Sequence, residues 1–276
     1  MRGFVQLYKK DLESISLMTI VLAVGILLWD AYFYTRIGIW KVEVAIIPTL
    51  LPFGVIGFWL LFQAIQVYRH EWQTGGIQLL LALPQPGVKI ALAKLAAVMT
   101  SFTLHLVVAI LGFVWVLWAG SHYSPDVWLF NMAVATVFQS RGALSWLIKI
   151  LAGAGLAYWL VGLANVVILQ LAYNYSRLTT RLRFLVGLAS FLVSQWVMTL
   201  CGAFGYKAFS WVPNLIIRVH LDPDAVRGIE SIHGMAQAPV QMARVTIDSG
   251  ILLGNALGVV LMFVVISYFL QDVMEA

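Results

Sequence analysis

The sequence predicts an all-α integral membrane protein with six transmembrane helices, and two observations carry this prediction. First, 62% of the 276 residues are hydrophobic and only 11% are charged, with a mean hydropathy of +0.91. A soluble domain has about 25% charged residues because water must wet its surface, so the apolar surplus here must face lipid. Second, the apolar residues form six continuous runs, each long enough to cross about 30 Å of hydrocarbon.

The six runs lie at about 16–34, 44–66, 92–118, 146–171, 185–206 and 249–270. They must be helical because lipid offers no hydrogen-bonding partner to an unpaired backbone amide. Apolar and polar residues do not alternate within the runs, which argues against a transmembrane β-barrel. We expect one transmembrane domain over residues 1–276.

The first fifteen residues, ahead of the first run, are predicted to form an amphipathic helix. Apolar residues recur at the three- and four-residue spacing of one helical face, whereas Lys9, Lys10 and Glu13 point elsewhere. The residues of this face are Phe4, Leu7, Tyr8, Leu12 and Ile15. Such a helix lies along the lipid headgroups with its apolar face down, so residues 1–15 are expected to be interfacial. An ordinary soluble cap on the first span is the alternative.

The basic residues favour a protein of the cell inner (plasma) membrane with both termini in the cytoplasm. With six spans, nine Lys and Arg residues fall inside, in compact clusters close to span ends, and eight fall outside. Four of the outer eight belong to one long segment, residues 207–248, and the charges of long loops resist translocation less than those of short loops. Residues 68–90 are then a cytoplasmic loop, and residues 207–248 are an outer loop. The net charge of +5 serves this topology and contacts anionic headgroups of membrane lipid, so nucleic-acid binding is not expected.

The titratable and metal-ligating residues show no catalytic or metal-binding pattern. Cys201 is the one cysteine, so neither a disulfide within the chain nor a cysteine metal site can form. The centres of the six runs carry no carboxylate, which argues against coupling to protons or sodium. Asp30 is assigned to an aromatic belt with Trp29 and Tyr32, and His105 is expected to make an interhelical hydrogen bond. We therefore predict no catalytic, cofactor-binding or metal-binding residues.

The segment between the second and third runs, residues 68–94, is the most informative about function. It begins with Arg69 and Glu71 and reaches a Gly-Gly pair that would break or bend a helix. A seven-residue apolar run, residues 77–83, follows and ends at Pro84, which stops helix continuation. A helix this short cannot span the bilayer, so it must lie against lipid headgroups or another protein. We interpret it as a docking element, with a plain interfacial loop as the alternative.

With these residues, the segment resembles the inner loop of ABC-2 type transporter permeases, the six-helix membrane subunits of ABC exporters. In that family the loop reads Arg-Glu, then Gly-Thr, then a leucine-rich turn that ends in Pro, then Gly-Lys at the start of the third span. The matching residues are Arg69, Glu71, Gly75, Leu79, Leu80, Leu81, Pro84 and Lys94. Gly76 stands where the family has Thr, and Ala93 precedes Lys94 where the family has Gly.

The resemblance implies the permease subunit of an ATP-driven exporter. In such permeases this loop docks into a cleft of a cytoplasmic ATPase, which assigns ATPase coupling to the matching residues from Arg69 to Pro84. ATP and Mg would bind to that separate subunit, because this chain lacks Gly-x-x-x-x-Gly-Lys-[Ser/Thr] and is not expected to be an enzyme. A second permease subunit, identical or homologous, would complete a dimer. Short outer helices would precede the last span, and the substrate would be amphipathic, lipid-like or a peptide.

Two other classes of function remain open. A secondary transporter or channel would work without an ATPase, and the scarcity of charges within the spans counts against it. A membrane-embedded enzyme would need a cluster of His, Glu or Asp on facing helices, whereas the sequence offers only isolated polar residues in its spans.

The last run opens with three glycines four residues apart, Gly250, Gly254 and Gly258. Glycines at this spacing line one helical face and let another helix approach closely. The sequence predicts helix packing at this face. It leaves open whether the partner helix belongs to the same chain or to a second subunit.

Overall fold

The computed structural model describes residues 2–37, 39–40, 44, 46–74, 86–123, 141–177, 179, 181–213, 215–219 and 243–275, and this part of the chain holds six long apolar helices. They are α1 (Arg2–Arg36), α3 (Leu51–Thr74), α5 (Gly87–Tyr123), α7 (Arg141–Ser176), α8 (Arg183–Ala208) and α10 (Ser249–Glu275). Their apolar stretches hold 23 to 34 residues. A helix of 23 residues rises about 35 Å, enough to cross the hydrocarbon core. The predicted fold class, an all-α membrane protein with six spans, is confirmed.

Local sequence explains where two of the helices begin. A 3-10 turn, η1 (Ile47–Leu50), leads into α3. Pro48 at the start of this turn and Pro52 in the first turn of α3 fit there, because the first N–H groups of a helix have no intrahelical partner. Asp248 caps α10, since its Oδ1 accepts hydrogen bonds from two backbone N–H groups of the first turn at 2.8 and 3.1 Å.

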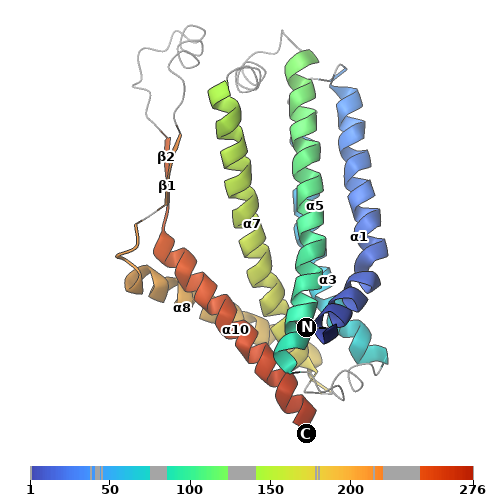
Figure 1. The fold of residues 1–276 in the computed structure, drawn as a ribbon, viewed down its shortest axis with the longest axis vertical. Helices are drawn as coiled ribbons and strands as arrows, with labels where there is room; N and C mark the ends of the chain where they lie inside the picture. The colour runs from blue at the N-terminus through green and yellow to red at the C-terminus, as the bar shows by residue number, and fades with distance from the viewer. Residues whose placement is uncertain are drawn as a thin grey trace.

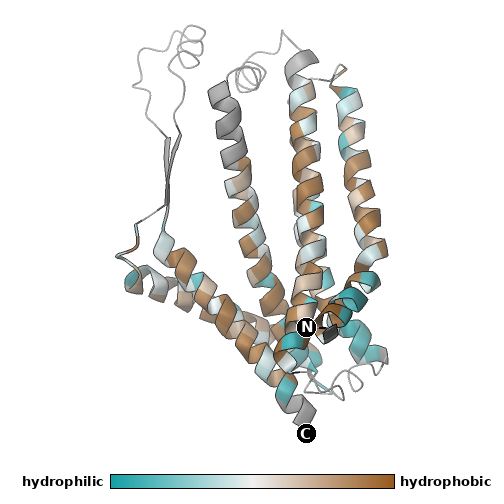
Figure 2. Ribbon diagram, in the orientation of Figure 1, coloured by the Kyte–Doolittle hydropathy of each residue, from teal (hydrophilic) through white to brown (hydrophobic). Residues whose placement is uncertain are grey.

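The helices form an upright group and a tilted pair (Figure 1). α1, α5 and α7 stand side by side along the long axis, whereas α8 and α10 run obliquely and meet α5 and α7 towards the end that carries both chain termini. Hydrophobic residues cover most of the length of the helices, and hydrophilic residues gather around the termini (Figure 2). This distribution suits helices whose middle parts contact lipid and whose lower ends contact water.

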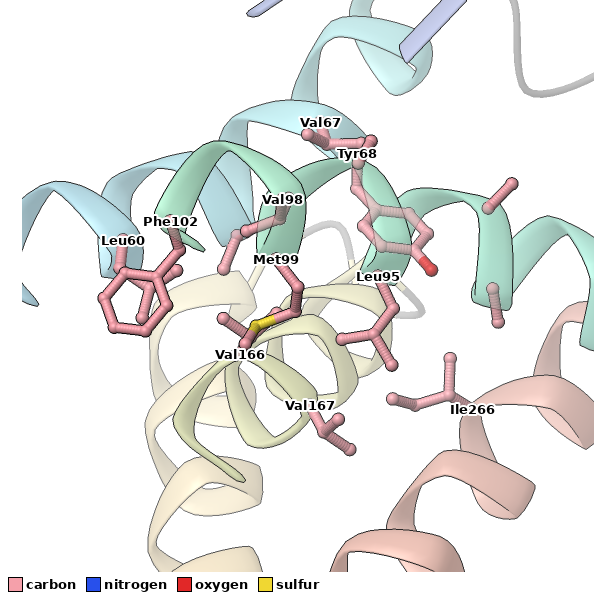
Figure 3. Close-up of a cluster of buried hydrophobic side chains, with 14 of the residues drawn as sticks. Leu60, Val67, Tyr68, Leu95, Val98, Met99, Phe102, Val166, Val167 and Ile266 are labelled. Atoms are coloured by element: carbon pink, nitrogen blue, oxygen red, sulfur yellow. The ribbon is translucent and has the colours of Figure 1, made fainter. Parts of the chain in front are cut away.

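The main hydrophobic core lies where α1, α3, α5, α7 and α10 converge (Figure 3). Figure 3 labels Leu60, Val67, Tyr68, Leu95, Val98, Met99, Phe102, Val166, Val167 and Ile266. Three alanines of α5, Ala91, Ala93 and Ala97, are fully buried there, and their small side chains let neighbouring helices approach closely. Large apolar side chains elsewhere are exposed, among them Phe58 (75%) and Phe184 (79%), which is the surface that a lipid-facing helix needs.

The predicted interfacial segment is the first part of α1, which continues without interruption into the first span. Figure 1 shows the first turns of α1, in dark blue, at an angle to the rest of the helix. The apolar face of these turns contacts protein: Leu7 and Ile15 belong to the core, and Phe4 and Tyr8 pack against it. The interpretation from sequence assumed that this face had no core to join, and α5 supplies one.

Two short strands lie within the predicted outer loop. β1 (Leu215–Val219) and β2 (Ala243–Ile247) pair antiparallel in register from one end to the other. These described residues are therefore strands, not the short outer helices that the resemblance implied. Three of the five residues in each strand are β-branched, and such residues favour a pleated backbone. Residues 220–242 of the predicted loop lie outside the described residues.

The predicted glycine face of α10 packs against α8 of the same chain; its members are Gly250, Gly254 and Gly258. A Cβ added to Gly254 would collide with the backbone of Cys201 and Gly205. A Cβ added to Gly258 would lie 2.6 Å from Met198 Sδ. The sequence left open whether the partner helix belongs to the same chain or to a second subunit. In the structure the partner is α8 of the same chain.

Candidate functional site

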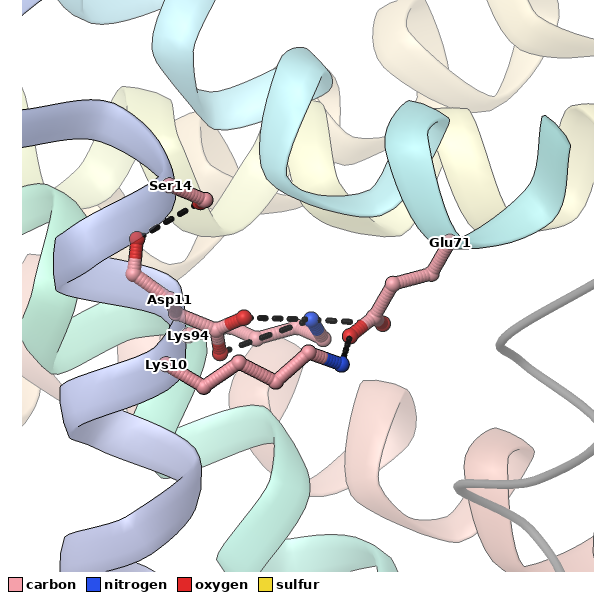
Figure 4. Close-up of polar contacts among 5 residues, drawn as sticks. All are labelled: Lys10, Asp11, Ser14, Glu71 and Lys94. Atoms are coloured by element: carbon pink, nitrogen blue, oxygen red, sulfur yellow. Dashed lines mark hydrogen bonds and ion pairs between the residues drawn. The ribbon is translucent and has the colours of Figure 1, made fainter. Parts of the chain in front are cut away.

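Four charged side chains form a buried ion network at the end of the molecule that carries the termini (Figure 4). Lys94 Nζ lies 2.6 Å from Glu71 Oε2 and 3.4 Å from Asp11 Oδ1. Lys10 Nζ lies 3.2 Å from Glu71 Oε1. These four residues, called the ion network below, join α1, α3 and α5.

Most of the ion network is removed from solvent. Lys94 is 1% exposed, Glu71 3% and Asp11 5%, whereas the side chain of Lys10 is 55% exposed. The ring of Tyr68 lies 5.1 Å from Lys94 Nζ and adds a cation–π contact. Two cations face two carboxylates, so the network is formally neutral. Removing one partner of a buried ion pair typically costs about 3–5 kcal/mol, because it leaves the other charge buried and uncompensated.

The register of three helices brings these side chains together. Asp11 lies four residues after Leu7 and four residues before Ile15, so all three share the buried face of α1. Glu71 lies in the last turn of α3 and Lys94 in the second turn of α5, among alanines that leave room for a long side chain. The start of α1, the end of α3 and the start of α5 lie at the same end of the molecule, so the charges meet in one place.

The Glu71–Lys94 pair closes the base of the segment that connects α3 to α5. Residues 72–93, which include the end of α3 and the start of α5, lie between Glu71 and Lys94 in the sequence, so both ends of this segment adjoin the same buried ion pair. The predicted docking run, residues 77–83, belongs to this segment and lies outside the described residues. A displacement of the segment therefore acts on α3 and α5 together, and Asp11 extends the contact to α1.

The residues predicted to couple to an ATPase fall into three settings. Arg69 is exposed on α3. Glu71 is not at the surface, because Lys94 and Lys10 bind its carboxylate inside the protein. Its carboxylate is therefore an internal contact between helices, and its predicted part in ATPase coupling stays a prediction. The remaining five, Gly75, Leu79, Leu80, Leu81 and Pro84, lie outside the described residues.

Three members of the ion network, Lys10, Asp11 and Lys94, are not among the site residues predicted from the sequence. The sequence interpretation placed Lys10 on the polar face of an interfacial helix and gave Asp11 no role. A signal was present, since Asp11 lies at helical spacing between two apolar residues. Lys94 gave a second signal, because an ionisable residue inside an apolar stretch usually has a buried partner.

A second polar layer lies about 12 Å further along α1, at Thr19. Thr19 Oγ1 and Ser101 Oγ are 2.8 Å apart, and Gln63 Nε2 donates to Ser101 Oγ at 3.0 Å. His105 Nε2 donates to the Thr19 carbonyl oxygen at 3.0 Å, which is the interhelical hydrogen bond predicted from the sequence. α1, α3 and α5 are thus joined by polar contacts at two levels.

Asp30 is buried between α1 and α5. The sequence interpretation assigned it to an aromatic belt, and this assignment is wrong. The residue is 1% exposed, and neither carboxylate oxygen has a hydrogen-bond partner among the described residues. It faces Gly112 of α5, where an added Cβ would collide with the carboxylate. Trp29 and Tyr32 are 37% and 45% exposed. Successive residues of a helix point about 100° apart, so sequence neighbours need not share a surface.

Neither a search for metal-binding groups among the described residues nor comparison with known proteins assigns a function to the chain. Within the described ranges, no three His, Cys, Asp or Glu residues are grouped as a metal site would require. No protein-family model, curated protein or solved structure matches the chain. The function is therefore argued from the ion network and its position in the fold.

Proposed function

We propose that the chain is the permease subunit of an ATP-driven exporter and works with a separate ATPase subunit. The observation that carries this proposal is the Glu71–Lys94 pair, which joins α3 and α5 at the base of the segment 72–93. A membrane subunit that receives mechanical work from outside the bilayer needs a firm connection between its docking segment and its spans. The resemblance of residues 69–94 to the inner loop of ABC-2 permeases supports the same function.

In the proposed mechanism, the run at 77–83 sits in a cleft of the ATPase, which binds ATP and Mg. Closure of the ATPase displaces both ends of the segment 72–93. Glu71 and Lys94 move together, because separating them would leave charges buried and unpaired. Asp11 carries the displacement to α1, and the adjoining hydrophobic core carries it to α7 and α10.

The proposal includes a location and further partners. Both termini lie at the end that carries the ion network (Figure 1), and we place this end in the cytoplasm and the spans in the inner membrane. A second permease subunit, identical or homologous, pairs with the exposed apolar surface of this one. An amphipathic, lipid-like or peptide substrate is exported between the two subunits.

A secondary transporter or channel that works without an ATPase is the second candidate, and one observation favours it. Asp30 is a buried carboxylate inside a span without a described hydrogen-bond partner. Ionisable groups in such places often mark ion or proton pathways. The ion network favours the exporter, since it lies beside the segment 72–93 and not in the middle of the membrane.

Co-purification tests the proposal. The tagged chain is extracted from its native membranes in mild detergent. The eluate is assayed for ATP hydrolysis and, by mass spectrometry, for a protein with the phosphate-binding loop that this chain lacks. We expect both in the wild type and neither in Leu80→Asp, although that variant still inserts. Ser210→Asp, beyond the end of α8, is the matched control and should retain both. A wild-type eluate without an ATPase, in detergent and in polymer-excised membrane discs alike, contradicts the proposal.

A further inference from the structure

An open groove runs along the membrane-spanning part of α5. Its volume is about 680 Å³, within the range of about 300–1,000 Å³ that small-ligand sites occupy. Apolar side chains between Leu92 and Val108 line most of it, and Trp159 of α7 also lines it. These residues of α5 rise about 24 Å along the helix axis and lie within its membrane-spanning stretch. The groove therefore opens towards lipid.

The polar atoms along the groove already have partners. Trp159 Nε1 donates to Thr103 Oγ1 at 2.9 Å, and Thr103 Oγ1 donates to the backbone carbonyl one turn earlier at 2.7 Å. Thr100 Oγ1 likewise donates to a carbonyl one turn earlier at 2.8 Å and lies 3.0 Å from the Tyr8 hydroxyl. These side chains leave no unpaired polar group in the groove, so the groove suits a hydrocarbon chain better than a polar ligand.

Lys89 lies at one end of the same helical face. Positions 89, 92, 96, 100, 103 and 107 follow the three- and four-residue spacing of one face of α5, and all but the first line the groove. Lys89 is exposed and is the third residue of α5, where the helix enters the membrane. A cation at the end of an apolar groove is complementary to a molecule with an anionic head and a hydrocarbon tail.

We propose that the groove binds one acyl chain of an anionic phospholipid and that Lys89 holds its phosphate. Charge favours this occupant over a second copy of the chain. Among the described carboxylate side chains at that end, Asp11 and Glu71 are buried in the ion network, and Glu13 pairs with Lys9 at 3.8 Å. A second copy would thus offer Lys89 at most the exposed Glu13, whose carboxylate already lies beside Lys9, whereas a lipid brings its own phosphate. The site does not depend on the proposed function.

Native mass spectrometry tests the role of the lysine. The purified protein is mixed with phosphatidylglycerol and phosphatidylcholine of identical acyl chains, and the ratio of the two bound lipids is measured. We expect wild type and Lys89→Arg to prefer phosphatidylglycerol. In Lys89→Glu this preference should fall by about fivefold or more, since one lysine at an anionic surface contributes about 1 kcal/mol. Lys207→Glu, in another helix, is the matched control. An unchanged preference in Lys89→Glu overturns the proposal.

A second variant tests the groove itself. Ala96→Phe fills the groove without removing a side-chain hydrogen bond, and it should reduce binding of both lipids. Leu111→Phe, on an exposed part of α5 outside the groove, should bind as wild type does. Gel filtration and circular dichroism check that both variants are folded. Wild-type lipid binding by Ala96→Phe overturns the proposal. A change of oligomeric state without a change in bound lipid also overturns it, because the groove would then face a second subunit.

Discussion

Lys94 Nζ and Glu71 Oε2 are 2.6 Å apart, although the two residues are 23 positions apart in the chain and belong to different helices. Both residues are buried, and Asp11 brings a third helix to the same ammonium group. This contact lies where α3 ends and α5 begins, on either side of the segment proposed to dock with an ATPase. It should therefore matter both for the stability of the protein and for the transmission of movement.

Removing the central lysine should destabilise the protein strongly. Lys94→Met leaves Asp11 and Glu71 buried with the half-exposed Lys10 as the remaining cation of the ion network, and we expect a loss of about 3–5 kcal/mol. Combining Lys94→Met with Glu71→Leu should recover part of this loss, because an apolar pair replaces a broken ionic pair. Thermal unfolding in detergent measures both effects.

The exposed pair Lys9–Glu13 is the matched control for this prediction, since its side chains are 75% and 67% exposed. Breaking it should change the stability by less than about 1 kcal/mol. Similar melting temperatures for Lys94→Met and Lys9→Ala would show that the ion network does not hold the helices together.

The contact between Asp30 and Gly112 gives a second prediction. Gly112→Ala should destabilise the protein by about 1–3 kcal/mol, because the new methyl group meets the buried carboxylate. Adding Asp30→Ala should relieve much of this loss by removing the colliding atoms. Gly25→Ala, on α1 with open space around an added Cβ, is the control and should not destabilise. If the double variant is no more stable than Gly112→Ala, the two residues do not face each other.

The glycine face of α10 gives a third prediction. Gly254→Ala places a methyl group against the backbone of Cys201 and Gly205, which cannot move aside as a side chain can. We expect a lower melting temperature in detergent, with a loss of about 1–3 kcal/mol. Gly153→Ala, in α7 with nothing within 4 Å of the added atom, should be tolerated. Equal tolerance at both positions would mean that α8 and α10 are further apart than described.

The orientation of the protein in the membrane can be tested by labelling. In a Cys201→Ala background, Thr74→Cys at the end of α3 and Ser210→Cys beyond the end of α8 introduce single thiols. With the termini in the cytoplasm, an impermeant thiol reagent should label Ser210→Cys in intact spheroplasts, whereas Thr74→Cys should react only in inverted vesicles. Labelling of both thiols from the same side contradicts the proposed topology.

The number and kind of helices could be predicted from the sequence, because crossing a bilayer demands only length and apolarity. The predicted apolar runs are shorter than the helices that contain them. The fourth run is predicted at about 146–171 whereas α7 is Arg141–Ser176, and the helix predicted at 1–15 and the run at 16–34 form one continuous helix, α1 (Arg2–Arg36). The difference arises because a helix can continue beyond the hydrocarbon, whereas an apolar run marks only the part within it.

The contacts between helices could not be predicted in the same way. Asp11 and Lys94 pair across 83 residues of chain, and nothing in either local pattern names the other as partner. Asp30 was placed with its aromatic neighbours in the sequence, whereas its own direction on the helix turns it towards Gly112. The tertiary packing of three helices decides which helix faces contact one another. The local pattern of a single sequence does not show which faces these are.

The proposed coupling is tested most directly by a nucleotide-dependent distance change within the membrane part of the purified assembly. Spin labels at Leu104 of α5 and Leu192 of α8, both exposed, report this distance by pulsed electron paramagnetic resonance in a Cys201→Ala background. With the ion network intact, ATP and vanadate should shift the distance distribution. In Glu71→Gln the ATPase should still bind and hydrolyse ATP while the distance stays fixed, and Glu13→Gln should behave as wild type. A full shift in Glu71→Gln, or no shift with the network intact, would contradict the account.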